Sequence, residues 1–270
     1  MSAGLKVTIL GSGSSGGVPR IGGKDGRGEW GACDASEPKN RRRRCSLLVE
    51  RGATQILVDC SPDMREQLID ARVSRLDAVL ITHDHADQCH GLDDLRMVAQ
   101  NMMRRVPVYS EAQTLRTLTE RFGYCFQSAA TGAYPAILDG HLLPRPFEKL
   151  TIEGKGGPIE VLPFDQDHGS MTSLGFRFGP IAYSSDVVGL DDAAFAALAG
   201  VNTWIVDALR YKPHPTHAHV DMALSWIAKV KPRRAILTNL HIDLDYKTLK
   251  NSLPAGVEPA YDGMEILGVA

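Results

Sequence analysis

The chain has 270 residues, of which 43% are hydrophobic, and this is enough to bury one sizeable core. Its formal net charge of -2 argues against a protein that holds long nucleic acid through a broadly basic surface. No segment approaches the roughly 20 uninterrupted apolar residues that a membrane helix requires. The start, MSAGLKVTIL, lacks the residue order of a secretory signal. We therefore expect a cytoplasmic protein with no membrane partner and no extended nucleic-acid partner.

The cysteines and the absence of repeats indicate a simple organisation. Five cysteines, an odd number without close pairs, make a disulfide framework unexpected and indicate a reducing compartment. No internal repeat, low-complexity tract or long linker divides the sequence. We expect one domain over residues 1–270, and a homodimer is left open as a partner.

Short β-branched apolar runs alternate with segments of helical spacing, and this order predicts the α/β class. Asp191 and Asp192 open one helical pattern, where carboxylates favour the positive end of the helix dipole, so we expect a cap there. The expected strands are 6–10, 45–50, 55–59, 77–82, 106–110, 159–164, 174–178, 181–185, 203–208 and 235–239. The expected helices are 64–71, 92–103, 112–122, 191–198 and 222–229.

Polar residues that can bind metals follow several of these strands. In open α/β sheets ligands gather beyond the carboxyl ends of the strands, so these side chains can share one site. Imidazole nitrogen and carboxylate oxygen suit zinc, manganese and iron(II), which make hydroxide from water near neutral pH. A solvated polar loop would explain the dense cluster at 83–90 but not its distant partners. The candidates are Asp59, His83, His85, Asp87, His90, His168, Asp186, Asp207, Asn239 and His241.

The stretch THDHADQCHGLDDLR resembles the His-x-His-x-Asp-His signature of the metallo-β-lactamase fold, and the chain is similar to its phosphodiesterase branch. Within that branch it most resembles the phosphoribosyl cyclic phosphate phosphodiesterases of the carbon-phosphorus lyase pathway. Further matching stretches include LGSGSSGGVPR (10–20), DHGSMTSLGFRF (167–178), YSSDV (183–187) and HAHVDMAL (217–224), so the match spans nearly the whole chain. The resemblance implies a four-layer αββα sandwich of two mixed β-sheets with helices on the outer faces.

Carried over position by position, the resemblance implies two divalent metals. His83, His85 and His168 would bind the first, Asp186 would bridge, and Asp87 would serve the second. We expect the first ion to be bound securely and the second more weakly, with manganese or zinc, or else iron(II), as the metal.

Two departures affect the second metal. Relatives place histidines where this chain has Gln88 and Asn239. Amide oxygens are weaker neutral ligands. We expect His241 to substitute through a shifted loop, while His90 is an alternative ligand or a plain loop residue.

The resemblance also implies catalytic roles. His217 would protonate the leaving oxygen, with His214 and His219 as rivals, and Asp87 would orient or deprotonate the attacking hydroxide. An exposed polar turn is the alternative explanation of the three histidines.

Two further stretches are candidates for phosphate binding. GSGSSGG offers backbone N–H groups and the hydroxyls of Ser14 and Ser15, although a tight turn explains it equally well. RRRR offers Arg43 and Arg44 for bidentate phosphate contacts, although it can also be a solvated charge run. Cys33 alone lies near the WG loop, so we expect no structural zinc there.

These observations favour a metal-dependent hydrolase that cleaves a small phosphodiester, a cyclic ribosyl phosphate or a mononucleotide-like ligand. An RNA 3′-end processing nuclease of the same fold is an alternative, but residues 126–148 are too short and too weakly basic for an obvious RNA-gripping arm. A thioester or lactone hydrolase needs neither the basic run nor His217. A nucleotide-binding sensor with little turnover is the alternative from another class, because Gln88 and Asn239 weaken one metal site.

Overall fold

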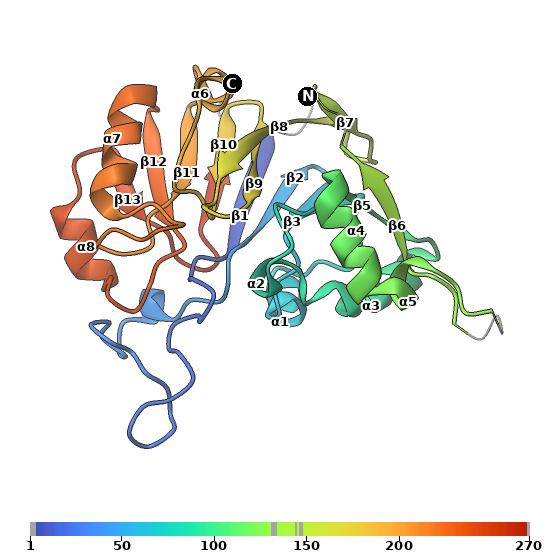
Figure 1. Ribbon diagram of the computed structural model, residues 1–270, viewed down its shortest axis with the longest axis horizontal. Helices are drawn as coiled ribbons and strands as arrows, with labels where there is room; N and C mark the ends of the chain where they lie inside the picture. The colour runs from blue at the N-terminus through green and yellow to red at the C-terminus, as the bar shows by residue number, and fades with distance from the viewer. Residues whose placement is uncertain (1–3, 131–133, 144, 146–147, 269–270) are drawn as a thin grey trace.

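Two seven-stranded sheets pack face to face, with helices on their outer faces (Figure 1). The computed structural model describes residues 4–130, 134–143, 145 and 148–268. The strand order is β14-β1-β2-β3-β4-β5-β6 in the first sheet and β13-β12-β11-β10-β9-β8-β7 in the second. Both sheets mix parallel and antiparallel pairs. The four-layer αββα sandwich predicted from the sequence is confirmed.

The strands of the first sheet are β14 (Glu265–Leu267), β1 (Leu5–Gly11), β2 (Ser46–Arg51), β3 (Thr54–Val58), β4 (Ala78–Leu80), β5 (Val106–Ser110) and β6 (Leu138–Leu142). The strands of the second are β13 (Val257–Pro259), β12 (Arg234–Thr238), β11 (Thr203–Asp207), β10 (Ile181–Ser184), β9 (Thr172–Phe178), β8 (Ile159–Asp167) and β7 (Leu150–Ile152).

Helices α1 (Met64–Asp70), α2 (Ala86–Cys89), α3 (Leu95–Met102), α4 (Ala112–Arg121) and α5 (Gly123–Phe126) lie on the side of the first sheet. Helices α6 (Asp192–Leu198), α7 (Val220–Val230) and α8 (Tyr246–Ser252) lie on the side of the second. Short 3-10 turns occupy Pro38–Asn40 and Leu92–Asp94. None of the helices that the structure describes is long and apolar enough to span a bilayer.

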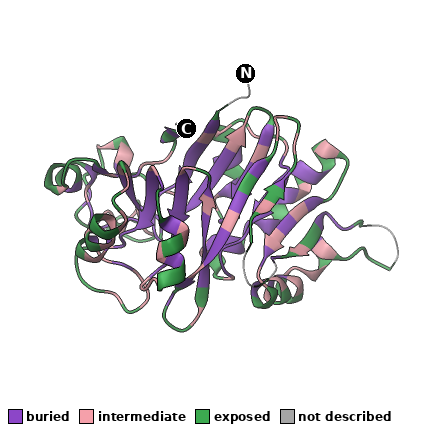
Figure 2. Ribbon diagram, turned by 90° about the horizontal axis from the view of Figure 1, so that it is seen from above, coloured by how far each residue is buried: buried purple, intermediate pink, exposed green. Residues whose placement is uncertain are grey.

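Side chains alternate between two covered faces of each sheet. In β1, Val7 and Ile9 enter the core between the sheets, while Leu10 packs on the helix side. In β11, Ile205 points into the core between the sheets, and Trp204 and Val206 pack against α6 and its neighbours. Strands buried on both faces have continuous apolar sequences, which is why these strands could be predicted from the sequence. Figure 2 shows the buried residues concentrated along the central strands.

Each of the ten expected strands lies on an observed strand, and each of the five expected helices on an observed helix. The expected cap is confirmed, because Asp191 accepts a hydrogen bond of 2.7 Å from the backbone N–H of Ala194. The short strands β7, β13 and β14 were not predicted from the sequence. β6 was not predicted either, and only its Leu138 is buried. It also missed the short helices α2, α5 and α8.

Three strands end on a non-glycine residue in the left-handed region. Asp59 follows β3 with φ 63°, Asp186 follows β10 with φ 52°, and Asn239 follows β12 with φ 62°. Asn and Asp tolerate this conformation better than other non-glycine residues, but it still marks a constrained backbone. The turn at each strand end places polar side chains at one edge of the sandwich.

Candidate metal centre

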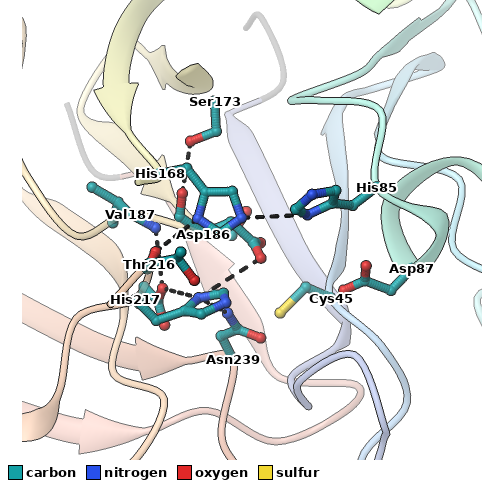
Figure 3. A network of polar contacts seen from close by, with 12 residues as sticks. Cys45, His85, Asp87, His168, Ser173, Asp186, Val187, Thr216, His217 and Asn239 are labelled. Carbon is teal, nitrogen blue, oxygen red and sulfur yellow. Dashed lines mark hydrogen bonds and ion pairs between the residues drawn. The ribbon is translucent and has the colours of Figure 1, made fainter. Parts of the chain in front are cut away.

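Three histidines converge from separate elements. His83 follows β4, His85 immediately precedes α2, and His168 follows β8. Their ring centroids lie 4.6 Å apart for His83 and His85, 5.0 Å for His83 and His168, and 5.1 Å for His85 and His168. One nitrogen of each lies within 4.8 Å of the others, which is a spacing suited to a shared metal ion. Figure 3 shows His85 and His168 turned toward one another.

Hydrogen bonds fix which ring nitrogens face the centre. His168 Nδ1 lies 2.7 Å from the carbonyl oxygen of Thr216, so it carries the proton and leaves the Nε2 lone pair toward His85. His83 Nδ1 lies 3.0 Å from Thr82 Oγ1. His83 Nε2 is buried and has no hydrogen-bond partner within the described part of the chain. Buried polar atoms normally have a hydrogen-bond partner, and an imidazole nitrogen that binds a metal has none within the protein. The unpaired Nε2 therefore fits a metal ligand.

Asp59 fixes the position of Thr82, which in turn contacts His83. Its Oδ1 accepts hydrogen bonds from the backbone N–H and the hydroxyl of Thr82, at 2.8 and 3.0 Å. Because the Thr82 hydroxyl donates to Asp59, its oxygen is left to accept from His83 Nδ1. The chain from Asp59 through Thr82 to His83 therefore sets the ring orientation of one candidate ligand.

A second group joins His168 to Asp186 and His217, whose candidate ligand atoms also lie within 4.8 Å of one another. His217 Nδ1 lies 2.9 Å from Asp207 Oδ2 and 3.8 Å from Asp186 Oδ1. The rings of His217 and His168 are 4.8 Å apart. His217 is therefore held by a carboxylate directly beside the three histidines (Figure 3).

Burial and charge shift the acidities of these groups. Burial alone would lower the pKa of His217, but its hydrogen bond to Asp207 and that carboxylate's charge outweigh burial and raise the pKa to about 9. Burial raises the pKa of Asp207 and of Asp186 above the usual carboxyl value. Burial, followed by the neighbouring His168 and His85, holds the pKa of His83 well below its usual range.

Asp87 lies in the first turn of α2, and burial together with the charge of Asp186 raises its pKa. The next residue, Gln88, is fully buried, and its Nε2 lies 3.1 Å from Asp87 Oδ2 and 3.2 Å from Asp186 Oδ2. The Nδ2 of Asn239 lies 3.2 Å from His217 Nδ1. Both departures from the expected histidines thus lie inside the site, where their amides contact its charged groups.

We expected His241 to replace the missing histidine ligand, but in the structure it does not join the candidate ligands. His241 Nδ1 lies 3.1 Å from the carboxylate of Asp243, accepts from the Asp243 backbone N–H, and belongs to neither group of converging ligands. Its backbone N–H donates to Leu209. His90 is exposed and packs edge-on against Phe122, with ring centroids 5.6 Å apart.

The rival histidines of the 214–219 turn have other surroundings. His214 Nδ1 accepts from the backbone N–H of Thr216 at 3.3 Å, and its ring lies 5.0 Å from that of His217. His219 immediately precedes α7 and makes no capping hydrogen bond with its side chain. Within the described part of the chain, neither of them pairs with a carboxylate as His217 pairs with Asp207.

The four residues expected to bind phosphate differ in their exposure and in their partners. Ser15 is exposed, while Ser14 is buried and its hydroxyl has no partner in the described structure. Arg43 pairs with Asp70 and Asp262, at 2.9 and 3.3 Å. Ser15 and Arg43 line a pocket of about 780 Å³.

Arg44 lines the same pocket, and its side chain pairs with Asp63. The two arginines that we expected at the phosphate are therefore already neutralised by carboxylates. Arg42, by contrast, is buried, and its guanidinium donates to Asn40 Oδ1 and to the carbonyl oxygen of Leu244.

For three residues of the site the sequence did not indicate the role that the structure shows; Asp59 and Asp207 were candidates only by their place after strands. Asp207 ends β11 and holds His217, Asp59 supports Thr82, and Cys45 lies near Asp87 and Asn239 in Figure 3. Asp207 and Asp59 carried a signal, since each sits at the end of an apolar strand. Cys45 is buried and packs on Thr238 Oγ1 at 3.7 Å, and nothing in the sequence indicated its position.

The donor set fits one divalent ion. Three imidazoles whose free nitrogens converge, with the Asp186 carboxylate beside them, are ligands that zinc, manganese and iron(II) accept. The orphaned Nε2 of His83 supports the same conclusion, because a bound cation would satisfy it.

Known proteins of similar sequence carry the same fold. The solved structure of a diphosphatase from the PhnP family matches with a TM-score of 0.86 and 33% identity, covering 98% of this chain and 97% of that chain. Zn²⁺-bound PqqB from Methylobacterium extorquens matches with a TM-score of 0.72 and 18% identity, covering 97% and 99%, and this likeness shows the fold alone.

Curated relatives match over smaller shares of their length. An octanoyltransferase of Porphyromonas gingivalis is 32% identical over 97% of this chain, yet the chain spans about half of that protein, 51%. A ribonuclease Z of Bradyrhizobium is 41% identical, over 23% of this chain and 21% of its own. The family model described as the beta-lactamase superfamily domain matches residues 54–242, which is more than half of the chain. The chain therefore belongs to the beta-lactamase superfamily, and the family resemblance drawn from its sequence is confirmed.

Proposed function

We propose that this chain is a metal-dependent hydrolase that cleaves a small phosphodiester, of the cyclic ribosyl phosphate or mononucleotide-like class. The observation that carries the proposal is the placement of the His217–Asp207 pair directly beside three converging imidazoles. Such a centre combines a cation site with a proton donor, which is what phosphoester hydrolysis requires. The similarity to the PhnP-family diphosphatase over nearly the whole of both chains supports it.

In this proposal His83, His85 and His168 hold the ion, and Asp186 completes its ligands. A divalent ion bound there supplies Lewis-acid chemistry, since it makes water a stronger acid and neutralises charge on a phosphoryl oxygen. Asp87, half-buried beside Asp186, orients the attacking water and accepts its proton.

His217 acts on the opposite side of the reaction. Asp207 accepts the Nδ1 proton of His217 and so fixes the tautomer and the ring orientation. The Nε2–H is then the group that donates a proton to the leaving oxygen. Among the described residues, His214 Nδ1 contacts Thr216 and no carboxylate, which favours His217 for this role.

A small substrate is favoured over a bulky RNA. Arg43 and Arg44 border the pocket near Ser15, but each already pairs with a carboxylate, so the basic run offers little free charge to a long polyanion. We place Ser14 and Ser15, with the backbone of their turn, as the candidates for phosphate contact, because Ser15 is exposed and the buried Ser14 hydroxyl has no partner in the described structure. Arg43 and Arg44 contribute to phosphate binding only if a substrate displaces their partners.

The test is turnover by the metal-loaded protein of phosphoribosyl cyclic phosphate, followed by ³¹P NMR, beside a 3′-extended tRNA precursor followed on a gel. We expect the cyclic ester to be opened and the tRNA to be left intact. His83→Ala should abolish turnover and metal retention together, while the exposed His90→Ala serves as the matched control. Processing of the tRNA with an inert cyclic ester would overturn the substrate class. Tight mononucleotide binding without any turnover would instead support a sensor.

A further inference from the structure

The carboxamide of Gln88 lies between two carboxylates in the interior of the site. Its Nε2 lies 3.1 Å from Asp87 Oδ2 and 3.2 Å from Asp186 Oδ2, and the residue is fully buried. A primary amide nitrogen carries two N–H donors and no lone pair available for a metal. Each of its protons is therefore given to one carboxylate, and the amide links the two acids as a neutral bridge.

The opposite orientation of this amide would be unfavourable. Turning it over would aim Oε1 at Asp87 and Asp186, so that three acceptor oxygens would face one another in a buried space. In the observed orientation Gln88 Oε1 is buried without a partner in the described structure, which is the smaller cost. The two carboxylates thus select the donor side of the amide.

The second group of converging side chains shares His168 and Asp186 with the first, and its remaining member, His217, already pairs through Nδ1 with Asp207 at 2.9 Å. Asn239 presents Nδ2, again a donor, to His217 Nδ1 at 3.2 Å. His241, two residues after Asn239, has its Nδ1 3.1 Å from Asp243 Oδ2. A second divalent ion beside Asp87 would depend on Asp87 and Asp186, and both carboxylates already accept hydrogen bonds from Gln88. The nearest imidazole, His217, is held by Asp207. The residues present do not fit a second metal.

We infer that the Gln88 carboxamide takes the place of a second cation, so that the protein binds one divalent ion per chain. Hydrogen bonds from Gln88, not a metal, hold Asp87 and Asp186 at their separation. Gln88 is in this sense a positioning residue that sets the metal number. The inference rests on the ligands given under the proposed function but not on the proposed substrate.

The experiment counts metal directly. The purified protein is loaded with excess Mn²⁺, desalted, and measured by inductively coupled plasma mass spectrometry and by electron paramagnetic resonance. We expect one equivalent of manganese per chain and the spectrum of an isolated ion. Two equivalents with an exchange-coupled spectrum would overturn the inference. Absence of any bound manganese, zinc or iron(II) would refute the proposed metal site itself, so the two failures are distinguishable.

A variant restores the missing imidazoles. The Gln88→His/Asn239→His double variant should bind two equivalents and show the exchange-coupled spectrum. Histidine is among the residues that tolerate the left-handed backbone at position 239, where φ is 62°. Gln88→Glu is the second variant, because it keeps the shape and replaces the donor by a carboxylate oxygen. Gln88→Met is the matched control that removes the donors without adding a ligand, and it should still bind one ion. If both Gln88→Glu and the double variant bind only one ion, the amide does not set the metal number.

Discussion

Replacing His217 tests the proton-donor role most sharply. The side chain lies 2.9 Å from Asp207 and directly beside the candidate metal ligands, and it is only 16% exposed. A positioned general acid contributes roughly 100-fold to 10,000-fold to a rate, which corresponds to about 2.7 to 5.4 kcal/mol of barrier. We therefore expect His217→Ala to lower kcat for phosphoribosyl cyclic phosphate by that factor. Metal content should remain at the wild-type level, since the three proposed ligand histidines are untouched.

The leaving group distinguishes an acid from a structural residue. A ribosyl alkoxide must be protonated as it departs, whereas p-nitrophenolate departs readily without a proton. The loss caused by His217→Ala should therefore be large for the cyclic ester and small for bis-(p-nitrophenyl) phosphate. His214→Ala serves as the control and should leave both rates near wild type. Equal losses on the two substrates would refute the acid role and would leave His217 as a structural residue.

Other predictions concern the supports of the site and of the fold. Asp207→Asn should lower kcat by about 10-fold to 100-fold with unchanged metal content, as is typical when the partner of a functional histidine is lost. Arg42→Met should lower the free energy of unfolding in urea by about 3 kcal/mol, because it leaves the buried carbonyl of Leu244 without its charged donor. Asp191→Ala should cost about 1 kcal/mol through loss of the α6 cap. Asp245 accepts several hydrogen bonds, including those of Thr248, and despite its partial burial these lower its pKa to about 2 from 3.8. Because the folded pKa is depressed, its contribution is present above about pH 4 and is lost as the pH falls toward 2, so the stability difference between wild type and Asp245→Asn should shrink over that window.

The central strands could be predicted from the sequence because both faces of each sheet are covered. Runs such as 203–208 read as continuous apolar segments for this reason. The short strands β7, β13 and β14 have three residues each, too few to establish a period of two. β6 is longer, but only Leu138 is buried, so it lacks an apolar run.

The convergence of the candidate ligands His83, His85 and His168 could be predicted because they lie in segments that follow strands whose ends meet at one edge. What the sequence could not show is the direction in which a chain turns after its strand. Asn239 adopts φ 62°, and the next residue, Leu240, is buried while His241 turns to Asp243. The expectation that His241 substitutes as a ligand depended on the opposite turn. The pairing of Asp207 with His217 likewise depends on the packing of β11 against the 214–219 turn.

The dependence of turnover on bound metal is the most direct test of the proposed metal-dependent hydrolysis. The chelator-treated protein is titrated with Mn²⁺ or Zn²⁺, and the bound ion and the hydrolysis of phosphoribosyl cyclic phosphate are measured on the same samples. We expect the rate to rise in proportion to the ion bound, and we expect His83→Ala neither to retain the ion nor to turn over substrate. Full turnover by the metal-free protein, or by His83→Ala, would contradict it.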